Sequence, residues 1–455
     1  MITPPRVASG LTRELGLSHA LSVVVGTVIG SGIFLVPTEM MQAVGSAKLV
    51  YLAWLTGGLL SFFGALTYAE LGAMKPQAGG EYVFIRDAYG PLPGFLCAWS
   101  WFIIAKPASI ATLTTGLVRV LGTFVAFGFL SHELFRSPFT FTYGQLLAVV
   151  TIFFVTFLNY IGVKKAGEFQ LVFTLLKVAV IVVIIVVGFS YASGSWGHFA
   201  AGYAGAKGGM TGFMAALVAS LWAYDGWNNL TMISGEVRSP EHNLPISLIA
   251  GVAIVGALYI LTNAAVQYVL PAAAIAATPR PASDAIGLVL GWHGAWLVSA
   301  GMALSILVAM NGTIMSAARV PYALARDRYF FSALAKVHPR FHSPAVALIA
   351  QASFSIVLLL LGGSYRQFFS LAIFSEWLFY MLAASTLFVF RWQDPQAPRP
   401  YRVWGYPWVP ALFVLAATVL LYYTFTNNLV NSALGCAVIV AGIPVFFFFA
   451  RKRRG

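Results

Sequence analysis

Long apolar stretches recur along the whole chain and are separated by short polar segments. A helix needs about 20 mostly apolar residues to cross the hydrocarbon core of a bilayer. The pattern therefore predicts an all-α membrane protein with twelve transmembrane helices and no soluble domain. The predicted spans are residues 17–43, 48–72, 91–125, 143–161, 168–190, 211–235, 246–270, 291–320, 344–362, 366–391, 406–427 and 430–450.

The charges refine this picture. The chain is 59% hydrophobic and only 9% charged, and its formal net charge is +13. If the N-terminus lies in the cytoplasm, most of the 27 Lys and Arg fall on cytoplasmic segments, which is the positive-inside distribution. This placement favours a multi-pass protein of the plasma or cytoplasmic membrane with both termini inside, and it argues against a nucleic-acid partner. The predicted external loops hold few basic residues: Lys48, Arg136, Lys207, Arg280 and Arg366.

Two predicted spans are interrupted near their middles by glycine and polar residues. The first contains GSG at 30–32, and the sixth contains AYDGWNN at 223–229. Because five spans precede the sixth, the breaks occupy equivalent places in a five-plus-five arrangement, which is typical of an inverted-repeat transporter. We therefore predict a cytoplasmic segment (1–14), a first five-helix repeat (15–190) and a second five-helix repeat (211–391). Two further helices (406–450) and a basic cytoplasmic tail (451–455) follow.

The breaks predict a site for a small zwitterion. A helix broken inside a membrane is tolerated where its free backbone groups face a cavity or a ligand. A half-helix starting near Ile33 would offer N–H groups and a positive dipole end to a carboxylate, since Gly30 and Gly32 permit close approach. Ser31 adds a hydroxyl, and carbonyls freed around residues 222–225 suit an ammonium group. Glycine can also serve helix packing alone, but two equivalent breaks favour an amino-acid site.

Several motifs then resemble those of a known family. They are GTVIGSGIF (26–34), NYIGVKKAGEFQ (159–170), WAYDGWNNL (222–230), EVRSPEHNLP (236–245) and NGTIMSAARVPYALARD (311–327). These motifs resemble the amino acid–polyamine–organocation superfamily of permeases, and within it the L-type amino-acid transporters, over about residues 15–450. The resemblance implies a LeuT-like fold of ten core helices in two inverted repeats plus two further helices. It also implies amino-acid transport, commonly by exchange and without sodium.

The resemblance assigns roles to individual residues. The residues that it implies for the substrate carboxylate are Val28, Ser31 and Gly32. The residues whose carbonyls it implies for the amine are Trp222, Ala223 and Asp225. It also makes Trp222 an aromatic gate over the site, and Asn228 the residue that steadies the unwound segment.

Lys177 is a charged residue in an otherwise apolar fifth span. Charges inside a membrane are costly and usually face a cavity. By the resemblance, its ammonium group takes the place of a cation in sodium-coupled relatives, near the carbonyls of Gly26–Ile29 and the hydroxyl of Thr313. Three interpretations stay open: a permanent charge that replaces sodium in an exchanger, a proton carrier that loses its proton on desolvation, or a structural tie between helices.

Lys106, Asp225 and Glu376 are the other charged residues deep in the spans. Asp225 lies in WAYDGWNN, which resembles the light chain that exchanges cationic and neutral amino acids, and it therefore predicts acceptance of cationic substrates. Alternatively, Asp225 pairs with Lys106 or caps the second half-helix. The roles of Lys106 and Glu376 stay open. Glu70 and Glu236 lie at predicted cytoplasmic span ends, where we expect them to pair with inner-loop arginines as gate elements.

Other classes of membrane protein fit less well. The 14 acidic residues and 7 histidines are scattered, so the chain predicts no membrane-embedded enzyme, no metal site and no cofactor. Channel filter motifs and rings of like charge are absent. A proton-coupled symporter is the alternative to an exchanger. Residues 126–142 lack the external cysteine with which light chains bind a partner glycoprotein, so we expect no disulfide-linked partner; the oligomeric state is not predicted.

Overall fold

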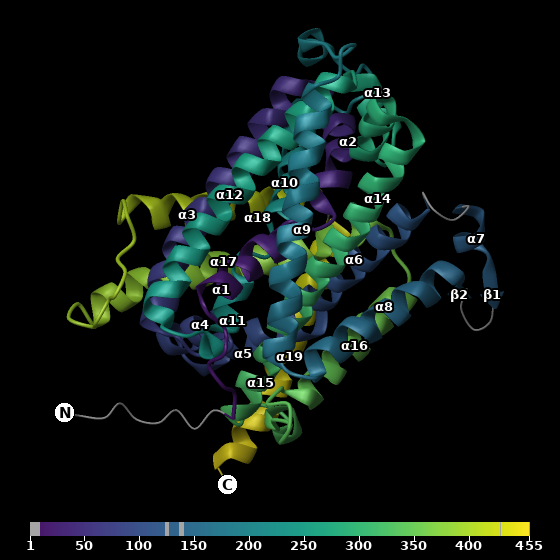
Figure 1. Ribbon diagram of the computed structural model, residues 1–455. Coiled ribbons are helices and arrows are strands. Elements are labelled where there is room, and N and C mark those ends of the chain that lie inside the picture. Colours follow the sequence, from purple (N-terminus) through teal and green to yellow (C-terminus); the bar gives the residue numbers. More distant parts are fainter. Residues whose placement is uncertain (1–9, 123–126, 136–140, 428, 455) are drawn as a thin grey trace.

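The computed structural model is almost entirely helical (Figure 1) and describes residues 10–122, 127–135, 141–427 and 429–454. Ten helices in this part of the chain are long and apolar enough to cross a membrane. Two shorter apolar helices, Gly209–Tyr224 and Ala345–Leu360, coincide with the predicted sixth and ninth spans. The chain is therefore a multi-pass membrane protein.

The helices follow the apolar stretches closely. In the first half of the chain, the described α-helices are α1 (Leu17–Val28), α2 (Gly32–Val44), α3 (Ala47–Met74), α4 (Glu81–Tyr89), α5 (Pro91–Ser100), α6 (Lys106–Leu121), α7 (Phe127–Ser131), α8 (Tyr143–Tyr160) and α9 (Val163–Phe189). A single π-helical turn, η1 (Trp101–Ala105), joins α5 to α6. A small antiparallel pair of strands, β1 (Glu133–Phe135) and β2 (Phe141–Thr142), precedes α8 and pairs Glu133 with Thr142.

The second half is built in the same way. Its α-helices are α10 (Gly209–Tyr224), α11 (Asn229–Met232), α12 (Pro240–Val269), α13 (Ala272–Ala277), α14 (Pro281–Ala317), α15 (Arg319–Arg326), α16 (Ala345–Leu360), α17 (Tyr365–Gln393), α18 (Trp408–Asn427) and α19 (Leu429–Arg454). Short 3-10 helices are η2 (Trp196–Phe199), η3 (Ser234–Glu236) and η4 (Ser332–Ala335).

Local sequence signals mark several helix boundaries. Helices α8 and α17 begin at capping boxes, in which Thr142 and Ser364 accept a hydrogen bond from the backbone N–H three residues later and a glutamine side chain reaches back. Helix α2 is terminated by Gly45, which follows Val44 and whose φ of 67° is left-handed. Gly291 interrupts α14 with a φ of 70°, so the continuous helix after it matches the predicted span 291–320.

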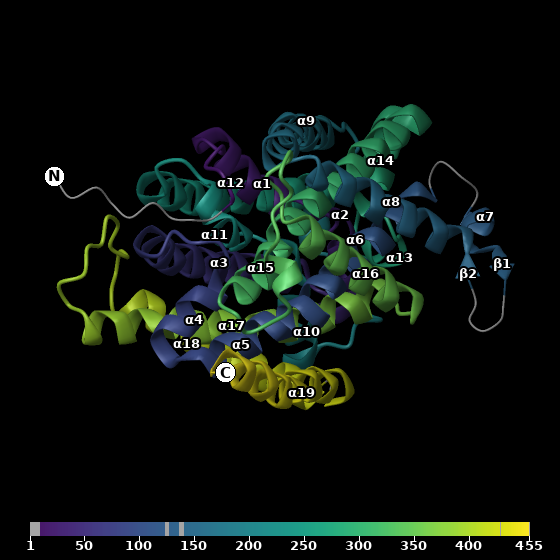
Figure 2. The same ribbon diagram turned by 90° about the horizontal axis from the view of Figure 1, so that it is seen from below.

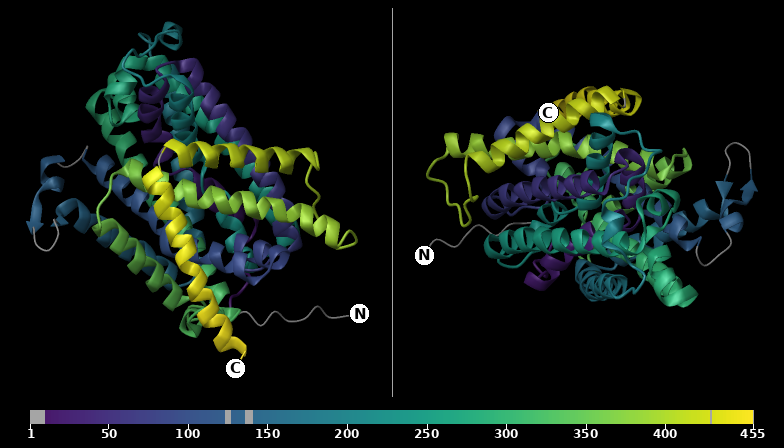
Figure 3. Two further views of the ribbon diagram at one scale, coloured as in Figure 1. Left: turned by 180° about the vertical axis from the view of Figure 1, so that it is seen from behind. Right: turned by 90° about the horizontal axis from the view of Figure 1, so that it is seen from above.

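The helices pack in layers around the two interrupted spans. Helices α13 and α15 mark opposite ends of the bundle, which we call the α13 end and the α15 end; α19 finishes at the α15 end (Figure 1). The span formed by α1 and α2 is 94% buried within the protein, whereas those of α18 and α19 are 22% buried. Views from below and from behind show α18 and α19 along the outside of the bundle (Figures 2 and 3).

The outward faces of the long helices are apolar. On α9, Val172 and Leu175 are 60% and 65% exposed, and on α8 Phe153 and Phe157 are each 59% exposed. Such large apolar patches are rare on soluble monomers, and they suit contact with lipid chains. The buried polar residues, in contrast, gather around the interrupted spans in the interior.

Candidate functional site

The two helix breaks lie directly against each other. Helix α1 ends at Val28 and α2 starts at Gly32, while α10 ends at Tyr224 and α11 starts at Asn229. A Cβ placed on Gly32 would lie 2.5 Å from the Cα of Ala223. A Cβ on Gly226, whose φ is +103°, would lie 2.9 Å from the side chain of Thr27. Glycine is therefore required on both sides for the two chains to approach so closely.

The ends of the half-helices supply opposite partial charges to this place. The N–H groups of Gly32 and Ile33 at the start of α2 have no partner within their own helix and form a positive end, whereas those of Phe34 and Leu35 donate to the Ser31 carbonyl. The carbonyls at the end of α10 form a negative end. The Trp222 carbonyl accepts the Asp225 N–H at 3.2 Å, and because a carbonyl has two lone pairs it keeps capacity for a second donor.

Tyr259 of α12 joins the two breaks. Its hydroxyl lies 2.8 Å from the carbonyl oxygen of Val28 and 2.8 Å from that of Ala223. A tyrosine hydroxyl has one proton to donate, so the two carbonyls share it. Both carbonyls therefore retain room for a cationic donor such as an amine.

A small cavity lies between the breaks, with a volume of about 20 Å³. Its lining includes seven of the residues singled out from the sequence, namely Val28, Gly30, Ser31, Gly32, Trp222, Asp225 and Thr313. Thr27, Ser109, Leu113 and Gly226 complete the lining. The space is close to that of one water molecule, so an amino acid enters only after surrounding side chains move.

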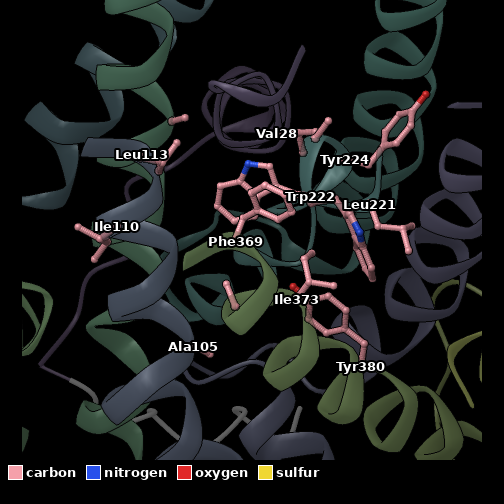
Figure 4. Close-up of a cluster of buried hydrophobic side chains, with 14 of the residues drawn as sticks. Val28, Ala105, Ile110, Leu113, Leu221, Trp222, Tyr224, Phe369, Ile373 and Tyr380 are labelled. Carbon is pink, nitrogen blue, oxygen red and sulfur yellow. The ribbon is translucent and has the colours of Figure 1, made fainter. Parts of the chain in front are cut away.

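Trp222 closes this cavity toward the α13 end. Its indole N–H donates to the hydroxyl of Tyr365 at 3.1 Å, and that hydroxyl is 3.0 Å from Ser31 Oγ. The Trp222 ring stacks on Phe369, with centroids 6.1 Å apart (Figure 4). Phe369 in turn lines a larger pocket of about 190 Å³ that includes Met214. The stacked rings therefore separate the two spaces.

Lys177 binds the end of α1. Its side chain is 1% exposed, and its Nζ donates to the carbonyl of Gly26 and to that of Ile29, the latter at 2.6 Å. Ser305 of α14 donates to the same Ile29 carbonyl at 3.0 Å. Thr313 does not share this contact as expected, because its hydroxyl donates to Ala309 within α14. The Lys177 ammonium therefore satisfies carbonyls that the break in the first span leaves free.

A second polar cluster surrounds Lys106, directly after the π-helical turn. The Lys106 Nζ donates to Glu376 Oε1 and to the side chain of Asn229, both at 2.9 Å. Ser109 donates to the same Glu376 oxygen at 3.2 Å. The direct ion pair of Lys106 is thus with Glu376, and not with Asp225 as in the alternative interpretation of Asp225. π-helical turns often occur at functional sites.

Asp225 is held from a different side. The hydroxyl of Tyr380 lies 2.8 Å from Asp225 Oδ1 and 2.9 Å from Asn228 Oδ1. The amide of Asn228 donates to Glu81 of α4 at 2.7 Å. Asn228 thus ties the unwound segment to α4 and α17, and the Asp225 carboxyl reaches the cavity wall.

Buried ion pairs cluster toward the α15 end. Glu236 and Arg319 form a two-point contact at 2.7 and 2.9 Å, and both side chains are 0% exposed. Glu70 pairs with Arg391 at 2.7 Å and with Arg399 at 3.4 Å. The expectation that Glu70 and Glu236 pair with arginines is confirmed. These contacts tie α3 to α17 and to the segment after it, and η3 to α15, on this side of the cavity.

Sequence reasoning missed several residues of the site, among them Tyr259, Tyr365 and Glu81. Tyr259, Tyr365 and Glu81 each contact a broken segment, yet each lies in a distant part of the sequence. For Tyr259, a lone hydroxyl in an apolar stretch was the available signal, but such a signal does not say which residue the side chain contacts. Within the residues described, no group of three or more His, Cys, Asp or Glu could hold a metal ion.

Known proteins resemble the chain over its whole length. The family described as Amino acid permease matches residues 15–449. The serine/threonine exchanger SteT of Bacillus subtilis is 32% identical over 98% of each chain. The human b(0,+)-type amino acid transporter 1 is 31% identical over 99% of this chain and 90% of its own. The human cystine/glutamate transporter is 29% identical over 96% of this chain and 85% of its own.

These matches confirm the resemblance that the motifs suggested, and they cover both interrupted spans. The matched proteins are transporters and not enzymes. The chain therefore belongs to the amino acid permeases of the amino acid–polyamine–organocation superfamily.

Proposed function

We propose that this permease is a sodium-independent amino-acid exchanger of the plasma or cytoplasmic membrane. It has twelve transmembrane helices, in which α10 and α16 join the ten longer spans. The first ten form two inverted five-helix repeats of the LeuT-like kind, 15–190 and 211–391, and 406–450 adds two helices. Both termini are cytoplasmic, which the positive-inside distribution of Lys and Arg supports.

The substrate zwitterion binds at the two breaks. Its carboxylate meets the positive end of α2 at Val28, Ser31 and Gly32, and its amine meets the carbonyls of Trp222, Ala223 and Asp225. The observation that carries this proposal is the close approach of Gly32 to Ala223, which brings the two poles together without a side chain between them. Trp222 acts as the gate, because it must leave Phe369 before a substrate enters.

Lys177 makes sodium unnecessary. Its ammonium group donates to the carbonyls of Gly26 and Ile29, which are the type of hard oxygen ligand that a bound cation would need. A cation at this place would repel the ammonium group and compete for the same oxygens. The buried charge therefore holds the end of α1 in every transport cycle.

Exchange is supported by the similarity of the chain to the serine/threonine exchanger SteT of Bacillus subtilis. The test is uptake of a labelled amino acid into proteoliposomes that contain this chain alone, since we propose no disulfide-linked partner. Uptake should require unlabelled amino acid inside and should be equal in sodium and choline buffers. Uptake into empty vesicles driven by an acid-outside gradient would instead identify a proton-coupled symporter.

A further inference from the structure

Three carboxyl groups and one ammonium group meet beside the substrate cavity. They belong to Glu81 on α4, Asp225 at the end of α10, Glu376 on α17 and Lys106 on α6. Lys106 binds Glu376 directly, and Asp225 interacts with both of them. Asn228 connects Glu81 to the same cluster, which we call the Lys106 cluster. Only Asp225 of these four lines the cavity.

Two carboxyl oxygens of the cluster have no hydrogen-bond partner among the described residues. They are Glu81 Oε2 and Glu376 Oε2, and the two side chains are 1% and 0% exposed. An ionised carboxylate oxygen buried without a donor is strongly disfavoured. A protonated oxygen carries no such penalty, because the added proton removes the charge and can itself be donated.

The charges of the cluster do not balance. With all three carboxyls ionised, Lys106 would leave two net negative charges in the interior. The other titratable side chains that interact with the cluster are Tyr68 of α3, Cys97 of α5 and Tyr380 of α17, and none of them supplies a positive charge. One bound proton would halve the excess, and so would one positive charge on a ligand.

We propose that Glu81, Asp225 and Glu376 together bind one proton, and that a cationic substrate side chain entering the cavity displaces it. The second part rests on the proposed function. On displacement, the O–H bond of one carboxyl breaks, the proton passes to water, and the carboxylate that remains faces the substrate cation through Asp225. The net charge of the cluster and its ligand is the same before and after. A neutral amino acid leaves the proton in place.

Glu81 shows that protonation lies within reach of physiological pH. Helix α4 lies outside the membrane-spanning helices, and burial raises the pKa of the Glu81 carboxyl to about 7, against the lowering effects of its hydrogen bonds and of Lys106. Because the carboxyls interact, the proton belongs to the group as a whole and not to one residue.

The first test measures proton release by purified transporter in weakly buffered detergent solution with a pH-indicator dye. Arginine should release about one proton per molecule bound, and a neutral amino acid none. Below the pKa of the cluster, the affinity for arginine should rise about tenfold per pH unit. Glu81→Gln and Glu376→Gln should each abolish the release and flatten this pH dependence. Glu168→Gln, on the exposed face of α9, is the matched control and should release protons like the wild type.

Binding of a neutral amino acid, measured as a thermal shift, checks that each variant is folded and that the substrate site works. Arginine binding without proton release by the wild type would overturn the proposal. So would unchanged release by both glutamine variants.

An infrared pH titration without substrate tests the proton site separately. The wild type should show a protonated-carboxyl band that Glu81→Gln or Glu376→Gln removes and Glu168→Gln keeps. If neither variant changes the band, the proton site is refuted. If the band behaves as expected but no amino acid binds, the proposed function fails while the proton site stands.

Discussion

Gly32 lies against the backbone of Ala223, and a Cβ on Gly32 would come within 2.5 Å of the Ala223 Cα. Carbon atoms in contact are normally about 3.5–4.0 Å apart. Even one methyl group at Gly32 would therefore push the two broken spans apart by about 1 Å. The positive end of α2 and the carbonyl end of α10 would then no longer fit one small zwitterion.

We predict that Gly32→Ala abolishes substrate binding. The added Cβ displaces one pole of the site from the other, so the purified variant should elute as a sharp peak yet show no thermal shift with amino acids. Gly16→Ala is the control, because a Cβ at Gly16 has no neighbour within 4 Å. Normal exchange by Gly32→Ala would contradict a carboxylate site at the start of α2.

Tyr365→Phe should loosen the gate. It removes hydrogen bonds to Trp222 and Ser31, and a net loss of about 1 kcal/mol would raise the open population about fivefold. The measurement is the rate at which a thiol reagent modifies Leu113→Cys, a cavity position, in a background without Cys97 and Cys436. Tyr422 is 67% exposed on α18, so Tyr422→Phe should leave this rate unchanged. If Tyr365→Phe also leaves the rate unchanged, the Tyr365 hydroxyl does not hold the gate closed.

The spans and their breaks were predictable because they are encoded locally. Hydropathy marks each span, and GSG at 30–32 and the polar run 223–229 mark the breaks. The structure places the gaps between α1 and α2 and between α10 and α11 at these sites. The ion pairs of Glu70 and Glu236 were predictable from charge, because a buried carboxylate at the end of a span needs a positively charged partner such as arginine.

Partners across the bundle were not predictable. Lys106 binds Glu376 over 270 residues of sequence, and Asp225 is held by Tyr380 instead of by Lys106. Which partner a buried polar side chain contacts depends on how each helix is rotated about its axis. That rotation is set by packing against all the neighbouring helices. For the same reason Thr313 turns to its own helix while Ser305 reaches Ile29.

Lys177→Ala should reduce exchange at least about tenfold. Without the ammonium group, the carbonyls of Gly26 and Ile29 lose their donor, and one unsatisfied buried carbonyl costs about 1–3 kcal/mol. Lys164→Ala, exposed on the same helix, is the control. The residual rate should be measured against pH: an unchanged profile assigns a permanent charge to Lys177, and a flattened one makes it a proton carrier. Wild-type activity from Lys177→Ala would leave it a packing residue.

Glu81→Gln should change how stability depends on pH. Burial raises the pKa of Glu81 from 4.5 to about 7 in the folded protein. The folded state therefore binds the proton more tightly, so the stability that Glu81 contributes is fully present below about pH 4.5 and is lost as pH rises through about 7. The difference in melting temperature, glutamine variant minus wild type, should therefore be larger at pH 8 than at pH 5. A constant difference would show that Glu81 does not titrate in this range.

Asp225→Asn should remove cationic substrates selectively. The Asp225 carboxyl lines the cavity and accepts a hydrogen bond from Tyr380, so it can attract a charged substrate side chain. Opposite charges about 4 Å apart attract by about 4 kcal/mol at an effective dielectric constant near 20, before desolvation is subtracted. A quarter of this would change selectivity about fivefold. The asparagine keeps an acceptor for Tyr380, so the segment should remain folded.

The measurement is uptake of a labelled neutral amino acid against unlabelled competitors. Arginine, lysine and ornithine should compete in the wild type and lose most of this effect in Asp225→Asn, while neutral competitors keep theirs. Glu39→Gln, in the larger pocket toward the α13 end, shows whether any nearby acid has the same effect. If cationic competitors are inert in the wild type, or if Asp225→Asn weakens all competitors equally, Asp225 is only a structural cap of the second half-helix and the permease carries neutral amino acids.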